Sequence, residues 1–265
     1  MPTAIVTGAS QGIGRAIALR LADDGFDVTL NSLKSEIECK GRKSVIAIGD
    51  VSLEKDVESI ISTSVEALGN LTVGYLCYGF WGSSNRSQVM VANAGIILNK
   101  RMMDITPDDW DRIQAVSDRY HHIQNNIAPR GRSNQEIIKQ PTAIAYSVSK
   151  WAVRGLTQAT ALELATHQIN SCAKDWQMWD EIDDSYSSAL GIPKGEAFRM
   201  AVEQRAAMKK PSTPEDIAGC VSFLAGKDSN LITGQSVIID GGMSPKFLQL
   251  RHFLCLTDGS GIQFC

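Results

Sequence analysis

The chain has no apolar run long enough to cross a membrane, and it has no excess of positive charge. Its 265 residues carry a formal net charge of −3, which gives no support to binding of nucleic acid or of a membrane surface. The N-terminus enters the apolar segment "TAIVTG" without basic leader residues. We therefore expect no signal peptide and a cytoplasmic protein.

Cysteine pairs with metal-binding spacing are also lacking, because the six cysteines are scattered along the chain. Reduced thiols are the expectation, as is usual in the cytosol. His121 and His122 are adjacent and would point apart on a helix or strand, so we expect a polar loop there rather than a metal site. The hydrophobic fraction of 43% and the length suit one large α/β domain better than two small ones.

Short apolar strands alternate with helical segments along the chain. This alternation predicts an α/β fold, with a single doubly wound parallel sheet of Rossmann type and helices on both faces. Thr213, Pro214 and Asp216 have the positions of an N-cap, a first helical residue and a first-turn acid. The expected strands are residues 3–8, 26–30, 44–52, 89–95 and 235–242, and the expected helices are residues 12–25, 33–40, 54–69, 145–165 and 213–226.

The segment "TGASQGIG" places Gly8, Gly12 and Gly14 between the first strand and the first helix. Glycine is needed where a backbone approaches a pyrophosphate closely, and the helix N-terminus offers free N–H groups to the anion. A tight turn between strand and helix would use glycine for steric reasons alone. The context of the motif favours a dinucleotide site.

Tyr146 and Lys150 are four residues apart and would share one face of a helix. A free tyrosine titrates near 10, and a neighbouring cation stabilises its phenolate and brings the pKa closer to neutrality. The pair would then be suited to proton transfer. An ordinary surface pair on an amphipathic helix is the alternative.

Taken together, the chain resembles the short-chain dehydrogenase/reductase family. The resemblance rests on "TGASQGIG", "GDVS", "NAG", "YSVSK", "STPEDIAG" and "ITGQSVIIDGG", which occur in the family's order over nearly the whole chain. The segments "AYSVSKWAVRGLTQATALELA" and "GIPKGEAF" are most similar to fungal and bacterial acetoin/diacetyl reductase-like members.

The resemblance implies a role for each matching residue. Tyr146 would be the general acid in reduction and the base in oxidation, and Lys150 would bind the nicotinamide ribose and lower the tyrosine's pKa. Asp50 and Val51 would hydrogen-bond the adenine, and Asn93 would lie beside the adenosine ribose. The implied set for NAD(P)(H) is Gly8, Ser10, Gln11, Gly12, Ile13, Gly14, Asp50, Val51, Asn93, Ala94, Gly95, Tyr146 and Lys150.

Other family positions do not match. Ser133 lies at about the separation from Tyr146 that the family's catalytic serine has, but "IAPRGRSNQEIIKQ" does not read as a strand. We expect Ser133 on an exposed or poorly ordered loop and the catalytic serine to be missing. Ser117 stands where the family has a proton-relaying asparagine. Ser32 follows the second strand without the charge that distinguishes NAD from NADP, so this choice stays open.

Three segments interrupt the pattern: an irregular insert at about 74–88, and disrupted stretches at 117–140 and 171–177. The last stands in place of a strand and lacks the family's Pro-Gly turn. We interpret these segments as translated intron, skipped exon or shifted frame, with genuine divergence as the alternative. The expected organisation is one reductase domain, residues 1–243, and an atypical tail, residues 244–265.

The sequence thus predicts an NAD(P)-dependent oxidoreductase that transfers hydride between nicotinamide and a small ketone, diketone or secondary alcohol, with activity impaired by the disrupted segments. The alternative is a dinucleotide-binding protein without catalysis. The family resemblance also implies homo-oligomers, assembled through helices around residues 109–116 and 146–164.

Overall fold

The computed structural model describes residues 1–69, 88–116, 144–167, 169–175, 183–184, 187–188 and 190–243. Four parallel strands form a sheet in the order β3-β2-β1-β4. The chain moves outward from β1 to β3 and then returns to place β4 on the other side of β1. The strands are β1 (Thr3–Val6), β2 (Asp27–Leu30), β3 (Ser44–Ile46) and β4 (Gln88–Val91).

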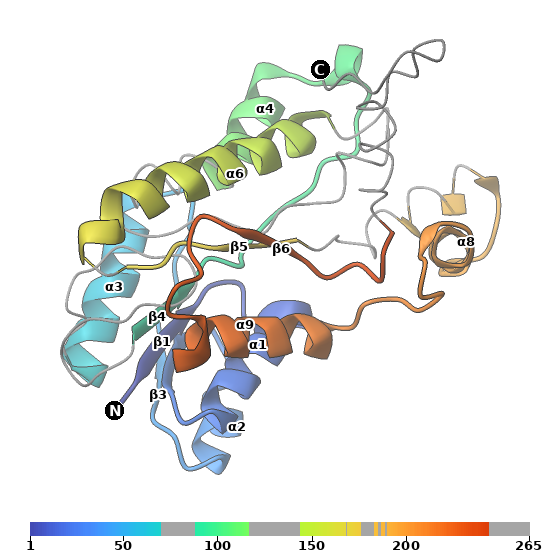
Figure 1. The fold of residues 1–265 in the computed structure, drawn as a ribbon. Coiled ribbons are helices and arrows are strands. Elements are labelled where there is room, and N and C mark those ends of the chain that lie inside the picture. The colour runs from blue at the N-terminus through green and yellow to red at the C-terminus, as the bar shows by residue number, and fades with distance from the viewer. Residues whose placement is uncertain are drawn as a thin grey trace, which may run out of the picture.

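Helices pack against the strands in an arrangement that Figure 1 shows. The helix α1 packs against α9, and α3 contacts the region of β3. The α-helices are α1 (Gly12–Asp23), α2 (Lys34–Cys39), α3 (Glu54–Leu68), α4 (Pro107–Gln114), α6 (Ile144–Leu164), α8 (Glu196–Arg205) and α9 (Pro214–Ala225). Short 3-10 helices are η1 (Met102–Asp104), η4 (Ala165–His167) and η5 (Lys227–Ser229).

A second parallel pair is formed by β5 (Ala173–Asp175) and β6 (Ser236–Ile238). Both α6 and α9 contact β5, so helices cover this pair from two sides. The expectation that residues 171–177 do not form a strand is therefore wrong for residues 173–175. Ser171 and Cys172, which precede the strand, and Ala173, which begins it, are small and almost fully buried, so this segment is buried without a run of large apolar residues.

The sequence patterns place most elements correctly. The parallel α/β fold is confirmed, and α1 buries Ile17, Ala18 and Leu21 as its periodicity predicts. The Thr213 cap is confirmed too, because its hydroxyl accepts from the Asp216 N–H while the Asp216 carboxylate accepts from the Thr213 N–H. The helix α8 has no counterpart among the predicted elements.

The expected boundary of the insert needs one correction. Gln88 is the first residue of β4, where it pairs in register with Thr3 and is 3% exposed. The ladder with β1 thus extends one residue beyond the apolar run that marks the strand in the sequence. The rest of the insert, the stretch 117–140 with Ser117 and Ser133, the His121–His122 pair and the tail 244–265 lie outside the described residues.

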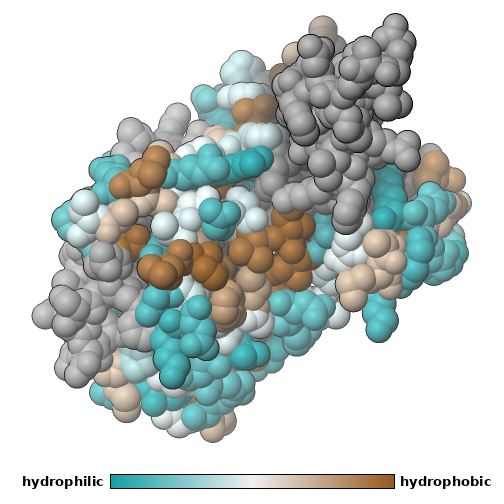
Figure 2. Space-filling view, in the orientation of Figure 1, coloured by the Kyte–Doolittle hydropathy of each residue, from teal (hydrophilic) through white to brown (hydrophobic). Residues whose placement is uncertain are grey.

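One hydrophobic core joins β1, β2, β4, α1 and α9. A smaller cluster, Val202, Ala206 and Met243, lies under α8, with Phe198 packed against it. Figure 2 shows apolar residues gathered across the middle of the visible face, over the part of the molecule where Figure 1 places β6. Among the described residues, no helix is both long and apolar enough to span a membrane.

Candidate active site

The glycine loop leads from the end of β1 into α1. Gly8 and Gly12 have φ of +62° and +54°, which other residues rarely adopt. A Cβ on Gly12 would meet no atom within 4 Å, so the backbone here borders open space. Gln11, the N-cap residue of α1, makes no capping hydrogen bond with its side chain. The first N–H groups of α1 are therefore available to an anion, and the loop fits a pyrophosphate.

Gly14 is required for a different reason from the one that the motif suggests. A Cβ there would overlap the carbonyl oxygen of Gly8 and would lie 2.5 Å from Nδ2 of Asn93. The close approach that Gly14 permits is thus between α1 and the loop itself. Gly8 is similarly tight, because its Cβ would lie 2.7 Å from Cα of Ala94. Gly8 and Gly14 therefore determine the shape of the anion cradle, the glycine loop with the N-terminus of α1, through close contacts with other protein atoms.

Polar side chains attach the glycine loop to the neighbouring strands. The Thr7 hydroxyl accepts hydrogen bonds from the N–H groups of Asn93 (3.0 Å) and Ala94 (3.1 Å). The Asn93 amide donates to the carbonyl oxygens of Thr7 and Gly8, at 3.1 and 3.2 Å. On the other side, Asn31 accepts from the N–H of Ala9 at 3.0 Å. Asn93, implied beside the ribose, therefore also holds the loop.

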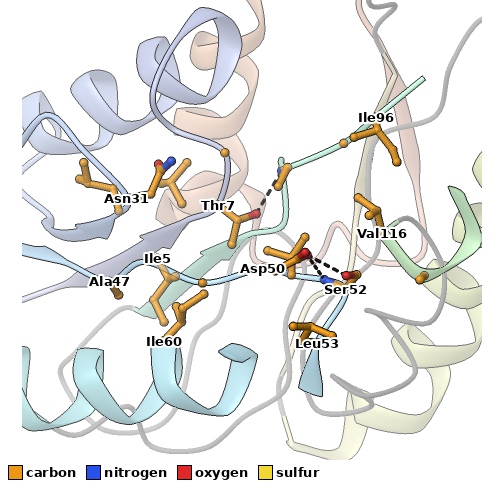
Figure 3. A pocket seen from close by; sticks show the side chains of 18 of the residues that line it. Ile5, Thr7, Asn31, Ala47, Asp50, Ser52, Leu53, Ile60, Ile96 and Val116 are labelled. Carbon is orange, nitrogen blue, oxygen red and sulfur yellow. Dashed lines mark hydrogen bonds between the residues drawn. The ribbon is translucent and has the colours of Figure 1, made fainter. Parts of the chain in front are cut away.

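A cavity of about 700 Å³ opens beside this loop, at the carboxyl ends of the strands (Figure 3). This is the edge where open α/β sheets bind ligands, at the point where the strand order reverses. Gly8, Asp50, Val51, Ala94 and Gly95 from the predicted cofactor set line it. Its further lining residues include Ile5, Thr7, Asn31, Ser52, Arg112 and Val116.

Asp50 is fixed at the rim of the cavity. Its Oδ1 accepts from the backbone N–H of Ser52 at 2.9 Å and from the Ser52 hydroxyl at 2.8 Å (Figure 3). These bonds, with the charge of Arg112, lower the pKa of the Asp50 carboxyl from its usual value. Asp50 is therefore ionised at neutral pH and accepts hydrogen bonds only.

Tyr146 and Lys150 lie together on α6, as their spacing predicts. Tyr146 is 1% exposed and Lys150 is 9% exposed, and Nζ of Lys150 lies 5.1 Å from the centre of the tyrosine ring. Burial of an amine and a phenol side by side excludes the surface-pair alternative. Gln114, at the end of α4, donates to the carbonyl oxygen of Ala145 at 3.2 Å. This hydrogen bond connects the start of α6 to α4, and the residues that follow α4 line the cavity.

Several of these positioning residues escaped the sequence patterns. Thr7, Asn31 and Gln114 act through contacts to chain segments up to 87 residues away. A short sequence motif cannot indicate partners that are so distant in the sequence. The only signal in the sequence was adjacency, because Thr7 precedes the first glycine and Asn31 follows the second strand. Among the described residues, no group of three or more His, Cys, Asp or Glu could hold a metal ion.

Comparison with known proteins decides the family. Residues 2–118 match the model of short chain dehydrogenases, and residues 132–244 match a model described as enoyl-(acyl carrier protein) reductase. The chain is 40% identical over 264 residues to a short-chain dehydrogenase/reductase of Armillaria gallica, covering 91% of this chain and 95% of that one. The chain belongs to the short-chain dehydrogenase/reductase family.

Other members agree with this assignment. This short-chain dehydrogenase/reductase is 37% identical over 268 residues to an L-2,3-butanediol dehydrogenase of Corynebacterium glutamicum, covering 91% of this chain and 97% of the relative. It superposes with a TM-score of 0.73 on a blue fluorescent protein from a metagenomic library in complex with NADPH, at 26% identity, covering 92% and 98% of the two chains. It is an oxidoreductase of alcohol or carbonyl groups, with NAD(P)(H) as cofactor.

Proposed function

We propose that this enzyme interconverts a small ketone or diketone and the corresponding secondary alcohol. The observation that carries the proposal is the buried Tyr146–Lys150 pair on a helix connected through Gln114 to the cavity wall. The relative named as an L-2,3-butanediol dehydrogenase supports the substrate class. Oxidation of one of two vicinal secondary alcohols gives a hydroxyketone, so the reverse reaction is reduction of a small ketone.

The bound cofactor supplies or accepts the hydride. Tyr146 donates a proton from its phenol oxygen to the carbonyl oxygen in reduction and takes it back in oxidation. Lys150 places a positive charge beside the ring and favours the phenolate over the neutral phenol. The glycine loop and α1 hold the pyrophosphate, while Asp50 and Val51 hold the adenine.

The test is a spectrophotometric assay with NADH and NADPH against diacetyl and acetoin, and with both oxidised cofactors against 2,3-butanediol. We expect turnover that depends on the carbonyl substrate with at least one cofactor. Absence of turnover in a protein that still binds dinucleotide would select the alternative, a binding protein without catalysis. The comparison of NADH with NADPH also tests whether the enzyme prefers NAD or NADP, which the uncharged Ser32 does not indicate.

Ser133 is the remaining question in the catalytic set. Its polar surroundings in the sequence indicate a loop, and we propose that it does not bind the substrate oxygen. Ser133→Ala should then change kcat by less than about twofold, whereas loss of an oxyanion-type donor costs about a hundredfold or more. A loss of that size in a folded variant would restore Ser133 to the catalytic set and would argue that its segment is native sequence.

Assembly into homo-oligomers and a cytoplasmic location belong to the same proposal. Two features support them: α6 leaves Val148, Trp151 and Leu162 between 43% and 81% exposed, and the described cysteines are free thiols. Trp151→Glu should lower the mass measured by light scattering if α6 faces a second copy. A wild-type protein that is monomeric at micromolar concentration would exclude the assembly.

A further inference from the structure

Hydrogen bonds hold both the side chain and the backbone of Asp50 at the rim of the cavity. Ser52 uses both its backbone N–H and its hydroxyl on the same carboxylate oxygen, Oδ1, at 2.9 and 2.8 Å. The backbone of Asp50 is fixed as well, because its N–H donates to Oδ2 of Asp56 at 2.8 Å. Asp56 lies in the first turn of α3, so the loop is anchored to a helix.

The second carboxylate oxygen of Asp50 remains available. Among the described residues, no donor bonds to Oδ2 of Asp50, while Oδ1 already accepts two hydrogen bonds. Asp50 itself lines the cavity. The rim therefore presents a single, oriented oxygen that only accepts hydrogen bonds.

Such an oxygen distinguishes between purine bases. Adenine carries an exocyclic amino group at position 6, which donates hydrogen bonds. Hypoxanthine carries a carbonyl oxygen at the same position, which would face the carboxylate with both groups accepting and neither donating. An acceptor left without its partner in a binding site weakens binding more than a lost contact does.

We propose that Ser52 is a positioning residue for the base of the cofactor. It holds Oδ1 of Asp50, directs Oδ2 to the adenine amino group, and so makes the site select adenine over hypoxanthine. The proposal rests on the proposed dinucleotide function, which places adenine at Asp50. It adds a residue that acts through Asp50, and it assigns the discrimination of the base to the Ser52 hydroxyl.

The experiment compares two cofactors that differ only in the base: NADH and its hypoxanthine counterpart, or the corresponding NADPH pair if the enzyme prefers phosphate. Dissociation constants are measured by calorimetry for the wild type, Ser52→Ala and Ser52→Thr. Ser62→Ala is the matched control, because Ser62 is an exposed serine on α3 whose hydroxyl donates to the carbonyl oxygen of Ser59 in the same helix.

We expect the wild type to bind the adenine form at least about tenfold more tightly. Ser52→Ala should reduce this ratio by about threefold to tenfold, because the backbone N–H still holds Oδ1 but the hydroxyl is gone. Ser52→Thr retains the hydroxyl and should restore the ratio. If a folded Ser52→Ala variant keeps the wild-type ratio, the proposal is overturned.

A second variant decides the question if Ser52→Ala does not fold. In Asp50→Asn the Ser52 donors should keep the amide oxygen, so that the NH2 group faces the base. The ratio should then move toward hypoxanthine by at least about tenfold. A wild type that binds both forms equally would refute the positioning role but not the oxidoreductase, whereas failure to bind any dinucleotide would refute both.

Discussion

Two parts of this enzyme, the glycine-loop half and the α8 half, differ in how extensively they are attached to the hydrophobic core. The glycine loop belongs to the main core, and hydrogen bonds attach it to the residues that follow β2 and β4. The helix α8 instead packs on a small cluster with Met243, and lies at the edge of the molecule (Figure 1). Asp183, which is 4% exposed, holds its first turn by accepting from the N–H groups of Gly195 and of Phe198, the latter at 2.8 Å.

We expect this difference to separate cofactor binding, at the glycine loop, from substrate binding, near α8. A site integrated into a core keeps its shape without ligand, whereas a helix on a small cluster opens at lower free energy. The α8 segment belongs to the connection after the carboxyl end of β5, where α/β enzymes place segments that contact ligands. Changes in the glycine loop should therefore affect affinity and stability together, and changes around α8 should affect substrate use alone.

Tyr146→Phe should have the largest effect and should leave both halves intact. The substitution removes only the hydroxyl that carries the proton, so kcat should fall about a hundredfold or more. The dissociation constant for the cofactor should change less than twofold. Steady-state kinetics and a cofactor titration on the same preparation measure both. A variant that keeps most of its kcat would remove Tyr146 from the mechanism.

Gly14→Val should damage the glycine-loop half. Its side chain meets the Gly8 carbonyl and the Asn93 amide, so dinucleotide affinity should fall at least tenfold, about 1.4 kcal/mol, and Tm should fall with it. Gly12→Ala meets no neighbour and strains only the backbone, by about 1 kcal/mol, so its effect on Tm should be smaller.

Gly219→Ala is the control for these two variants. It lies inside α9 with no atom within 4 Å of the added Cβ, and alanine there should stabilise the helix by about 0.5–1 kcal/mol. Thermal unfolding and cofactor titration should separate the three positions. Equal loss of Tm at Gly12 and Gly14 would argue against the internal packing role of Gly14.

Asp183→Ala should loosen the α8 half alone. Two N–H groups at the start of α8 lose their acceptor, which typically costs about 1 kcal/mol. We expect a higher KM for the carbonyl substrate with a cofactor affinity within twofold of wild type. Asp184→Ala is a suitable control, because its side chain makes an exposed ion pair with Lys194 at 2.8 Å. If cofactor affinity falls as much as substrate affinity, the two halves are not separable in this way.

The smallest effect concerns acid stability at the start of α4. Lys100 and Thr106 hydrogen-bond the Asp109 carboxylate and lower its pKa to about 2. A lowered pKa stabilises the folded state above the unfolded pKa near 4, and this contribution is lost as pH falls toward 2. The Tm difference between wild type and Asp109→Asn, about 1–2 °C at neutral pH, should vanish near pH 2. A difference that grows on acidification would contradict the assignment.

The sequence predicted the fold well where the information is local. Periodicity located α1, α3 and α6, and the Thr213–Asp216 box located the start of α9. It failed where burial depends on distant partners. The small residues before and in β5 show no strand pattern, because their burial comes from α6 and α9 on either side.

For the site, the patterns identified the groups that are proposed to contact the cofactor and substrate, but not the residues that hold those groups in place. Gly8 and the Tyr146–Lys150 pair were found because their chemistry requires particular residue types at fixed spacing, and Asp50 was found through the family resemblance. Asn31, Ser52 and Gln114 position other groups through hydrogen bonds, and nothing in the sequence distinguishes them from ordinary polar residues. Only their hydrogen-bond partners show what they do.

The bonds between Thr7 and Asn93 also bear on the order of folding. They join residues 86 positions apart, and β4 must lie beside β1 before they can form. Closing so long a loop costs chain entropy that only later contacts recover, which makes this step slow compared with formation of α1. A partly folded chain with β1 and α1 in place would still lack the finished anion cradle. Dinucleotide binding should therefore report the late docking of β4 against β1. Excess cofactor should slow unfolding, because it favours the state in which the Thr7–Asn93 hydrogen bonds are formed.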